Sequence, residues 1–258
     1  MMGALAGDMI GAPYEGRDPP EGDFPLFGPG SVFTDDSVLS VAVAEALMET
    51  QDFAAALKRW ARRYPDAGYG PRFKDWAFGR SASAPASWGN GAAMRVAPVG
   101  WAADSEDEAL EGARASARPS HDHPDALAGA EGVALAIVLA RRGETPDAIR
   151  AALAARFGWT LPAALDRIPT SKGFDTAART TVPPAVACAL AGADWEQAVR
   201  AAVRLGADAD TQGAIAGAVA EARFGLPDAV ARDVRRCLDR PLLAVVDRFA
   251  AWLKRRRR

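Results

Sequence analysis

The spacing of the apolar residues constrains the fold of this chain more than any other feature. In most segments alanine, leucine and valine recur at intervals of three and four residues, which is the repeat of an α-helix. Runs of β-branched residues are few, and no Asn-Gly pair joins two alternating segments as in a hairpin. Hydrophobic residues make up 49% of the 258 positions, enough for a large core. We therefore predict an all-α fold, a single-domain orthogonal helical bundle over residues 1–258.

Prolines and glycines divide this pattern into helices and loops. Pro13 ends a first helix, and Pro183 and Pro184 suit the first turn of a later one. Loops are expected over 16–33, 64–71, 79–91 and 119–125, and 158–184 is expected to be mostly irregular. The expected helices cover 2–13, 37–50, 53–63, 72–78, 104–117, 126–142, 146–156, 185–191, 195–205, 228–238 and 242–254, with another from Gln212 onward and a short buried piece at 92–100.

Two carboxylates and a hydroxyl stand at the entrance of the helix from Gln212. Asp208 and Asp210 are two residues apart, so within a helix they would point about 200° apart. They can converge only in the turn before the helix, beside Thr211. Oxygen-only groups at such a turn suit Mg²⁺ or Mn²⁺. The alternative is an aspartate N-cap with a second acid in the first turn, which is a common arrangement.

A second stretch of the same kind occurs near the start of the chain. Thr34, Asp35 and Asp36 precede a long apolar helix. If the two helix entrances face each other, their four carboxylates gather in one place, and such a cluster needs cations to stay ionised. A two-metal site with one bridging carboxylate would meet that need.

The first helix carries glycines at every fourth position. Gly3, Gly7 and Gly11 lie on one side of it, and each costs about 1 kcal/mol relative to alanine. We expect this side to pack closely against another backbone. Asp8 and Glu15 lie near that contact, with Glu15 on the loop that follows Pro13.

The loop at 79–91 contains hydroxyl groups, glycines and one large aromatic residue, Trp88. Exposed backbone N–H groups in such a loop, placed before a helix, can hold phosphate oxygens. The alternative is a plain linker with Trp88 in the core. Both histidines, His121 and His123, lie in the loop at 119–125, where turn chemistry is a commoner explanation than metal binding.

Charge and cysteine content restrict the class of protein. The formal net charge is −2, which gives no general argument for nucleic-acid binding. The basic run at 254–258 is interpreted as a solvated helix end, with an anionic partner as the alternative. Cys188 and Cys237 match no metal-binding spacing, and Asp8 interrupts the first apolar run. The longest uncharged apolar run, 132–140, is too short to cross a bilayer. We expect a cytoplasmic monomer without a signal peptide.

These motifs together resemble the ADP-ribosylglycohydrolase family. The resemblance covers most of the chain in one order. Its parts are Gly-Asp-x-x-Gly-x-x-x-Glu at 7–15, Thr-Asp-Asp-Ser at 34–37, Gly-Tyr-Gly at 68–70, Gly-Asn-Gly-Ala-Ala-Met-Arg at 89–95, Ser-His at 120–121 and Asp-x-Asp-Thr at 208–211. Trp88 stands where the family often has tyrosine, and Gln212 replaces the usual aliphatic residue.

The resemblance implies an all-α fold with two Mg²⁺ or Mn²⁺ ions in a central cleft lined by loops. It assigns one metal to Thr34, Asp35, Asp36 and Asp210, and the other to Asp208, Asp210 and Thr211, with Asp210 bridging. It places Glu15 beside the metals, where Glu15 or Asp36 could act as the catalytic base. The residues it assigns to the ADP-ribose cleft are Gly68, Tyr69, Gly70, Ser87, Trp88, Gly89, Asn90, Gly91 and His121.

The implied activity is metal-dependent hydrolysis of the glycosidic bond at ribose C1″ of a mono-ADP-ribosylated protein, nucleic acid or small molecule. Nucleic acid enters only as a modified substrate, and the acceptor stays open among arginine, serine, a nucleobase and a metabolite. One alternative is another binuclear metallohydrolase, such as a phosphoesterase. The other is a non-catalytic ADP-ribose binder.

Overall fold

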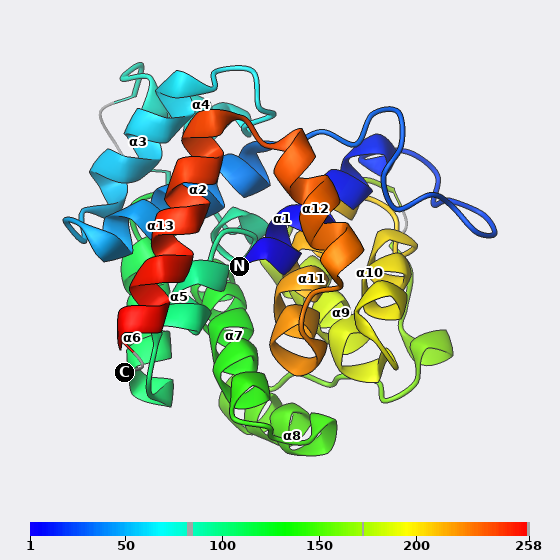
Figure 1. Ribbon diagram of the computed structural model, residues 1–258. Coiled ribbons are helices and arrows are strands. Elements are labelled where there is room, and N and C mark those ends of the chain that lie inside the picture. Colours follow the sequence, from blue (N-terminus) through cyan, green and yellow to red (C-terminus); the bar gives the residue numbers. More distant parts are fainter. Residues whose placement is uncertain (82–84, 172, 257–258) are drawn as a thin grey trace.

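The computed structural model describes residues 1–81, 85–171 and 173–256, and it confirms the all-α prediction (Figure 1). Within those residues the only β-type pairing is an isolated bridge between Gly89 and Ala177. The α-helices are α1 (Met2–Gly11), α2 (Asp35–Met48), α3 (Phe53–Arg63), α4 (Pro71–Ala77), α5 (Ala97–Ala102), α6 (Glu106–Ala117), α7 (Pro124–Arg141), α8 (Pro146–Phe157), α9 (Ala178–Ala191), α10 (Trp195–Val203), α11 (Ala209–Phe224), α12 (Asp228–Cys237) and α13 (Arg240–Arg256). The 3-10 helices are η1 (Ala12–Tyr14), η2 (Asn90–Ala92) and η3 (Leu165–Arg167).

Most expected helices are present, with ends shifted by at most two residues. The short buried piece at 92–100 resolves into the end of η2 and the start of α5. Parts of three expectations lie outside the described residues. These are positions 82–84 of the loop at 79–91, position 172 of the irregular segment, and positions 257–258 of the basic run.

Two helices begin more than two residues earlier than the sequence predicts. α11 starts at Ala209 rather than Gln212, because the non-helical backbone of the preceding turn ends at Asp208 (φ −88°, ψ 67°). α9 starts at Ala178 rather than at 185, so Pro183 and Pro184 lie inside the helix. The prediction that these prolines open the helix, and that 178–184 is irregular, is therefore wrong.

A tertiary contact explains the early start of α9. The N–H of Ala178 donates to the carbonyl oxygen of Trp88 at 3.1 Å, which fixes the first turn before the prolines are reached. The two prolines leave the carbonyl groups of Arg179 and Thr180 without helical partners. Both residues are exposed, so water can hydrate those groups.

α1 and α11 cross in direct backbone contact near the middle of the molecule (Figure 1). A Cβ atom on Gly7 would overlap the carbonyl oxygen of Gly213, and one on Gly3 would overlap that of Gly217. The expected close packing of the glycine side of the first helix is thus confirmed. This crossing sets Asp8, on α1, beside the first turn of α11.

The helices around this crossing are buried on most of their sides. α2 and α7 are apolar around most of their circumference, which is typical of helices within a core. α3 and α12 are strongly amphipathic and cover the core from outside. The N-terminal ends of α2 and α11 are thereby held inside the molecule rather than at its surface.

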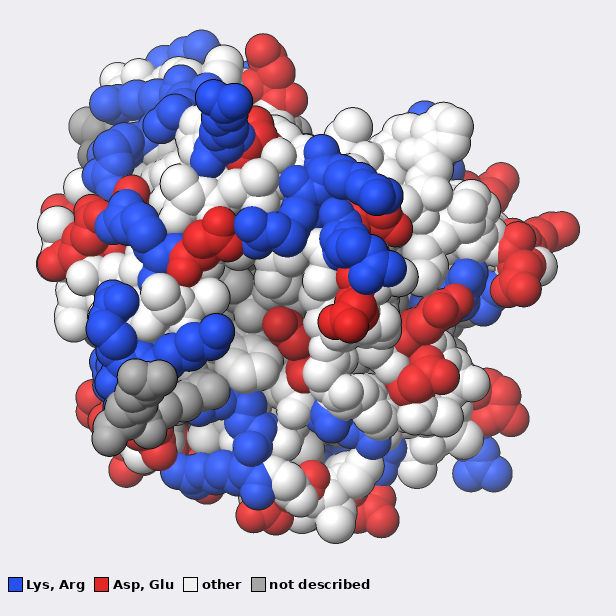
Figure 2. All heavy atoms as spheres, in the orientation of Figure 1, with Lys and Arg blue, Asp and Glu red and all other residues white. Residues whose placement is uncertain are grey.

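Both signs of charge are spread over the face that carries α12 and α13 (Figure 2). Arg235 of α12 forms a salt bridge with Asp247 of α13 at 2.7 Å, and Arg256 pairs with Asp104 at 3.4 Å. The described part of the basic run therefore belongs to a partly paired helix end. In the described residues, no helix is both long and apolar enough to cross a membrane.

Candidate functional site

The buried carboxylate of Asp8 ties α1 to the N-terminal end of α2. Asp8 accepts the N–H of Thr34 at 3.0 Å and the N–H of Ser37 at 3.1 Å. It also accepts the hydroxyl of Thr34 at 2.7 Å and the hydroxyl of Ser37. Two of these donors are N–H groups at the start of the helix that lack helical partners. Asp8 thus fixes the position of Asp36 inside the molecule.

A strained turn presents Asp208 at the start of α11. Gly206 and Ala207 both have left-handed backbones (φ 79° and 58°), a conformation that non-glycine residues such as alanine rarely adopt. The side chain of Gln212 holds this turn by donating from Nε2 to the carbonyl oxygen of Gly206 at 2.5 Å. Asn90 then donates from Nδ2 to Asp208 at 2.6 Å. An aliphatic residue at position 212 could not form the first of these bonds.

The acids of the two helix entrances meet. Within the described residues, Asp8, Asp36 and Asp210 form one group that could hold a cation, and Glu15, Asp208 and Asp210 form another. In each group the candidate ligand atoms lie within 4.8 Å of one another. Asp210 belongs to both groups, which is the arrangement expected of a bridging carboxylate.

Burial and mutual repulsion raise the pKa values of these acids. Burial raises the pKa of Asp8 to about 6, although its hydrogen bonds act in the opposite direction. The pKa of Asp36 is raised well above its usual value by burial and then by the charge of Asp210. Burial and the charge of Asp208 do the same to the pKa of Asp210. The cluster therefore favours protons or cations over bare carboxylates.

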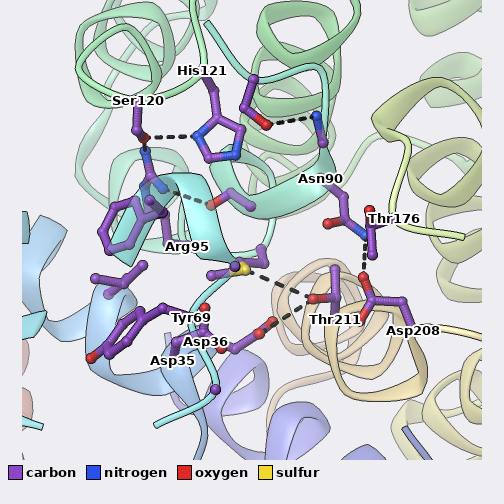
Figure 3. A pocket seen from close by; sticks show the side chains of 18 of the residues that line it. Asp35, Asp36, Tyr69, Asn90, Arg95, Ser120, His121, Thr176, Asp208 and Thr211 are labelled. Atoms are coloured by element: carbon purple, nitrogen blue, oxygen red, sulfur yellow. Dashed lines mark hydrogen bonds between the residues drawn. The ribbon is translucent and has the colours of Figure 1, made fainter. Parts of the chain in front are cut away.

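The threonines of the two predicted ligand sets lie on either side of Asp36. The hydroxyl of Thr211 donates to Asp36 at 3.2 Å, across the two helix entrances (Figure 3). The hydroxyl of Thr34 donates to Asp8 and lies 3.5 Å from Asp36. Asp35 belongs to neither acid group, and its N–H donates to the carbonyl oxygen of Ala67 at 2.6 Å. The structure thus brings Asp35 to the edge of the cluster rather than into its centre.

A cleft of about 680 Å³ opens above the acids. This volume is within the usual range for small-molecule sites. All nine residues predicted to line the ADP-ribose cleft line it, together with the acids Glu15, Asp35, Asp36, Asp208 and Asp210. Trp88 is 49% exposed, so its alternative placement in the core is wrong. The buried side chain of Tyr69 stacks on Phe73, and its hydroxyl has no hydrogen-bond partner among the residues that the structure describes.

The loop that carries Trp88 is fixed on two sides. The N–H of Asn90 donates to the carbonyl oxygen of Thr176 at 2.8 Å, and the N–H of Ser87 donates to that of Ser120 at 3.2 Å. The N–H of Gly89 donates to the hydroxyl of Ser87 at 3.1 Å. The N–H groups of Gly89 and Asn90 therefore hold the loop itself and are not free to bind a phosphate.

The two histidines have different surroundings. His121 is buried and lines the cleft. Its Nδ1 lies 2.7 Å from the hydroxyl oxygen of Ser120. His123 is turned to the start of α7, where its Nδ1 accepts the N–H of Asp125 at 3.2 Å. The turn-chemistry interpretation of His123 is thus confirmed.

Sequence reasoning missed Asp8 of the acid cluster and several residues that line the cleft, among them Arg95 and Phe174. A single acid in an apolar helix carries no local sign of its partners. Arg95 lines the cleft although it is fully buried, and only its place in a family motif marked it. Phe174 is 61% exposed at the mouth of the cleft, and it lay in a segment without periodicity.

Comparisons with known proteins agree with this arrangement. The ADP-ribosylhydrolase ARH3 of Bos taurus is 33% identical over 180 residues, which cover 56% of this chain and 49% of that protein. ARH3 of Homo sapiens is 31% identical over 185 residues, covering 56% of this chain and 50% of that protein. The chain thus matches about half the length of these curated relatives. An uncharacterised protein of Archaeoglobus fulgidus is 29% identical over 275 positions, with 88% of each chain covered.

Structural similarity extends over nearly the whole chain. A solved ADP-ribosylglycohydrolase-related protein complex contains a chain with a TM-score of 0.66 and 29% identity. The match covers 92% of this chain and 96% of that chain. The family model for ADP-ribosylglycohydrolases matches residues 1–258. The chain therefore belongs to the ADP-ribosylglycohydrolase family.

Proposed function

We propose that this protein hydrolyses the glycosidic bond at ribose C1″ of a mono-ADP-ribosylated substrate and releases ADP-ribose, using two Mg²⁺ or Mn²⁺ ions. Membership of the family supports a hydrolase acting on ADP-ribose linkages. The observation that carries the proposal is the sharing of Asp210 by two acid groups on the floor of a cleft large enough for a nucleotide.

The donor atoms fit hard divalent cations. Every candidate ligand in the two groups is a carboxylate oxygen, the type that Mg²⁺ and Mn²⁺ prefer. Asp36 Oδ1 is buried and has no hydrogen-bond partner within the described part of the chain, so a cation would satisfy it. Asp8, Asp36 and Asp210 would hold one ion, and Asp208 and Asp210 the other, with Thr34, Asp35 and Thr211 as the further predicted ligands and Glu15 beside the second ion. When bound, such ions supply Lewis-acid stabilisation of ribose hydroxyl groups and of a water molecule.

Glu15 is the best candidate for the catalytic base. It is exposed at the cleft, whereas Asp36 is buried and accepts the hydroxyl of Thr211. Partial desolvation, together with the charges of Asp208 and Asp8, raises the pKa of Glu15. A pKa shifted in the direction of neutral pH suits a general base. Glu15 would take a proton from the attacking water as the bond between C1″ and the acceptor breaks through an oxocarbenium-like state. The water oxygen would then be bonded to C1″, and the proton taken by Glu15 would balance the proton that the departing acceptor gains.

Identification of the products by mass spectrometry tests the reaction. We expect intact ADP-ribose and an unmodified acceptor when a set of defined substrates, ADP-ribosylated on arginine, serine, a nucleobase or a metabolite, is incubated with protein and Mg²⁺ or Mn²⁺. AMP or ribose 5-phosphate as the primary product would identify a phosphoesterase instead. Binding of ADP-ribose without turnover of any substrate would identify a non-catalytic binder.

Replacement of Glu15 by glutamine tests the assignment of the base. The substitution Glu15→Gln keeps the size of the side chain and removes its charge, so ADP-ribose binding should persist while turnover falls about 100-fold or more. Single-turnover kinetics measures the loss, with Glu21→Gln on the exposed loop as the matched control. Release of ADP-ribose at the parent rate would transfer the role of base to Asp36.

A further inference from the structure

A fully buried arginine lies behind the histidine of the cleft. The Arg95 guanidinium donates from Nη1 to the carbonyl oxygen of Gly91 at 2.9 Å and from Nη2 to that of Ser116 at 3.2 Å. The same Nη2 donates to the hydroxyl of Ser120 at 2.8 Å. That hydroxyl lies 2.7 Å from Nδ1 of His121 (Figure 3). Arg95, Ser120 and His121 thus form a continuous hydrogen-bonded chain that ends at the cleft wall.

The direction of this chain follows from the available protons. A guanidinium has only N–H groups to offer, so Ser120 accepts from Arg95. Ser120 then has one proton of its own, and His121 Nδ1 is its other hydrogen-bonding partner among the described residues. If the hydroxyl accepted from both groups, its own proton would be buried without a partner, at a cost in free energy. The Ser120 hydroxyl therefore donates to Nδ1, which is then unprotonated. In a neutral imidazole the proton then lies on Nε2.

The charge state of His121 agrees with this assignment. Burial lowers the pKa of His121 well below its usual value, and the positive charge of Arg95 lowers it further. The ring is therefore neutral, with one donor and one acceptor nitrogen. Arg95 keeps its charge, because burial lowers the pKa of its guanidinium only to about 9.

The protonated nitrogen faces the space beside Gly91. A Cβ atom on Gly91 would lie 2.9 Å from Nε2 of His121, so a larger residue there would block this donor. The N–H groups of Gly89 and Asn90 in the same wall already bond within the protein. A substrate phosphate in this part of the cleft would therefore find the His121 Nε2–H as a fixed donor.

We propose that Arg95 and Ser120 are positioning residues that hold His121 as a neutral imidazole protonated on Nε2, aimed at a phosphate oxygen of the bound nucleotide. The nature of the anion rests on the proposed function, whereas the tautomer does not. A fixed donor costs no reorganisation when the substrate binds, which is the advantage of a preorganised polar site.

Nitrogen-15 NMR of the histidine rings tests the tautomer directly in the unmodified protein. The chain has two histidines, so a His123→Gln variant assigns both sets of signals. We expect His121 to show a protonated Nε2 and an unprotonated Nδ1 in the free protein. A protonated Nδ1, or a mixture of the two tautomers, would overturn the proposal.

Ser120 variants test the positioning role in binding. Without the Ser120 hydroxyl, as in Ser120→Ala, the ring of His121 should be free to adopt either tautomer. ADP-ribose binding should weaken about tenfold, the size expected for one hydrogen bond to a charged group. Ser120→Thr keeps the hydroxyl and should restore both properties. Ser116→Ala is the matched control, because Ser116 is equally buried and its hydroxyl donates to Ala113 instead. Equal weakening in the Ser120→Ala and Ser116→Ala variants would reduce Ser120 to a structural role and overturn the proposal.

The two proposals fail in different ways. An Nε2–H tautomer in a protein that binds no ADP-ribose would support the positioning role and overturn both the phosphate assignment and the proposed function. ADP-ribose binding with a protonated Nδ1 would leave the proposed function standing and overturn the positioning role.

Discussion

At the scale of single residues, Asp210 has the most demanding position in the cleft. It is the member shared by both acid groups, and it stands in the first turn of α11, where its Oδ1 accepts the N–H of Thr211 at 2.9 Å. An amide at this position would place an NH₂ group or a neutral oxygen where the two proposed cations would need a charged ligand. The proposed metal centre thus depends on one carboxylate.

The substitution Asp210→Asn should abolish turnover and lower the metal content of the purified protein, because a bridging ligand serves both ions. Mass spectrometric metal analysis and an ADP-ribose release assay measure the two effects. Asp228→Asn, in the first turn of the remote helix α12, serves as the control. Parental metal content and activity in Asp210→Asn would contradict the two-metal assignment.

Trp88 is the second residue on which a single change is informative. Because its ring is exposed at the cleft, an aromatic contact with the adenine or the adjoining ribose is expected, worth about 1–3 kcal/mol. Trp88→Ala should therefore weaken ADP-ribose binding about tenfold or more in calorimetry. Phe224→Ala removes an exposed aromatic side chain outside the cleft and should leave the dissociation constant unchanged. An unchanged constant in Trp88→Ala would mean that the ring does not touch the ligand.

At the scale of helices, some features of the fold follow from the local sequence pattern and others from tertiary contacts. The helical repeat predicted nearly every helix, because periodicity is a local property of the sequence. It failed at α9, where the anchor between Trp88 and Ala178 outweighed two prolines. The convergence of the two helix entrances was expected only from the resemblance to the family, because clustered acids repel one another. The hydrogen bonds of Asp8 and Gln212 could not be predicted from the sequence, because their partners are set by tertiary placement or by an unusual turn.

The crossing of α1 and α11 yields a prediction about stability. Gly7→Ala puts a methyl group into the backbone of α11 at Gly213, so the helices must separate and the acids they carry must shift. We expect a loss of about 1–3 kcal/mol or more in the free energy of unfolding. Denaturant titration followed by circular dichroism measures it. Gly28→Ala, near only a proline side chain on an exposed loop, should change little. Equal stability of the two variants would mean that the helices do not cross so closely.

At the scale of the whole molecule, the fold holds an acid cluster inside an apolar core. Folding brings Asp8, Asp36 and Asp210 together out of water, and this raises their pKa values. A carboxyl group with a raised pKa binds its proton more tightly in the folded state than in the unfolded state. The stability of the metal-free protein therefore falls as the pH rises through these pKa values, and it recovers as the pH falls towards the values of the unfolded chain.

Removal of metal should therefore lower the melting temperature, and more so at high pH. Cations bind only the folded cluster, and a concentration 100-fold above the dissociation constant contributes about 2.7 kcal/mol, or about 5 °C or more for a chain of this size. Scanning calorimetry of EDTA-treated protein, with Mg²⁺ or Mn²⁺ added back, measures the shift. The shift should be larger at about pH 8 than near the pKa of Asp8, about 6, because protons compete with the cations there. Equal melting temperatures with and without metal at pH 8 would contradict a cation-binding cluster, and a shift that grows as the pH falls would contradict the assignment to these acids.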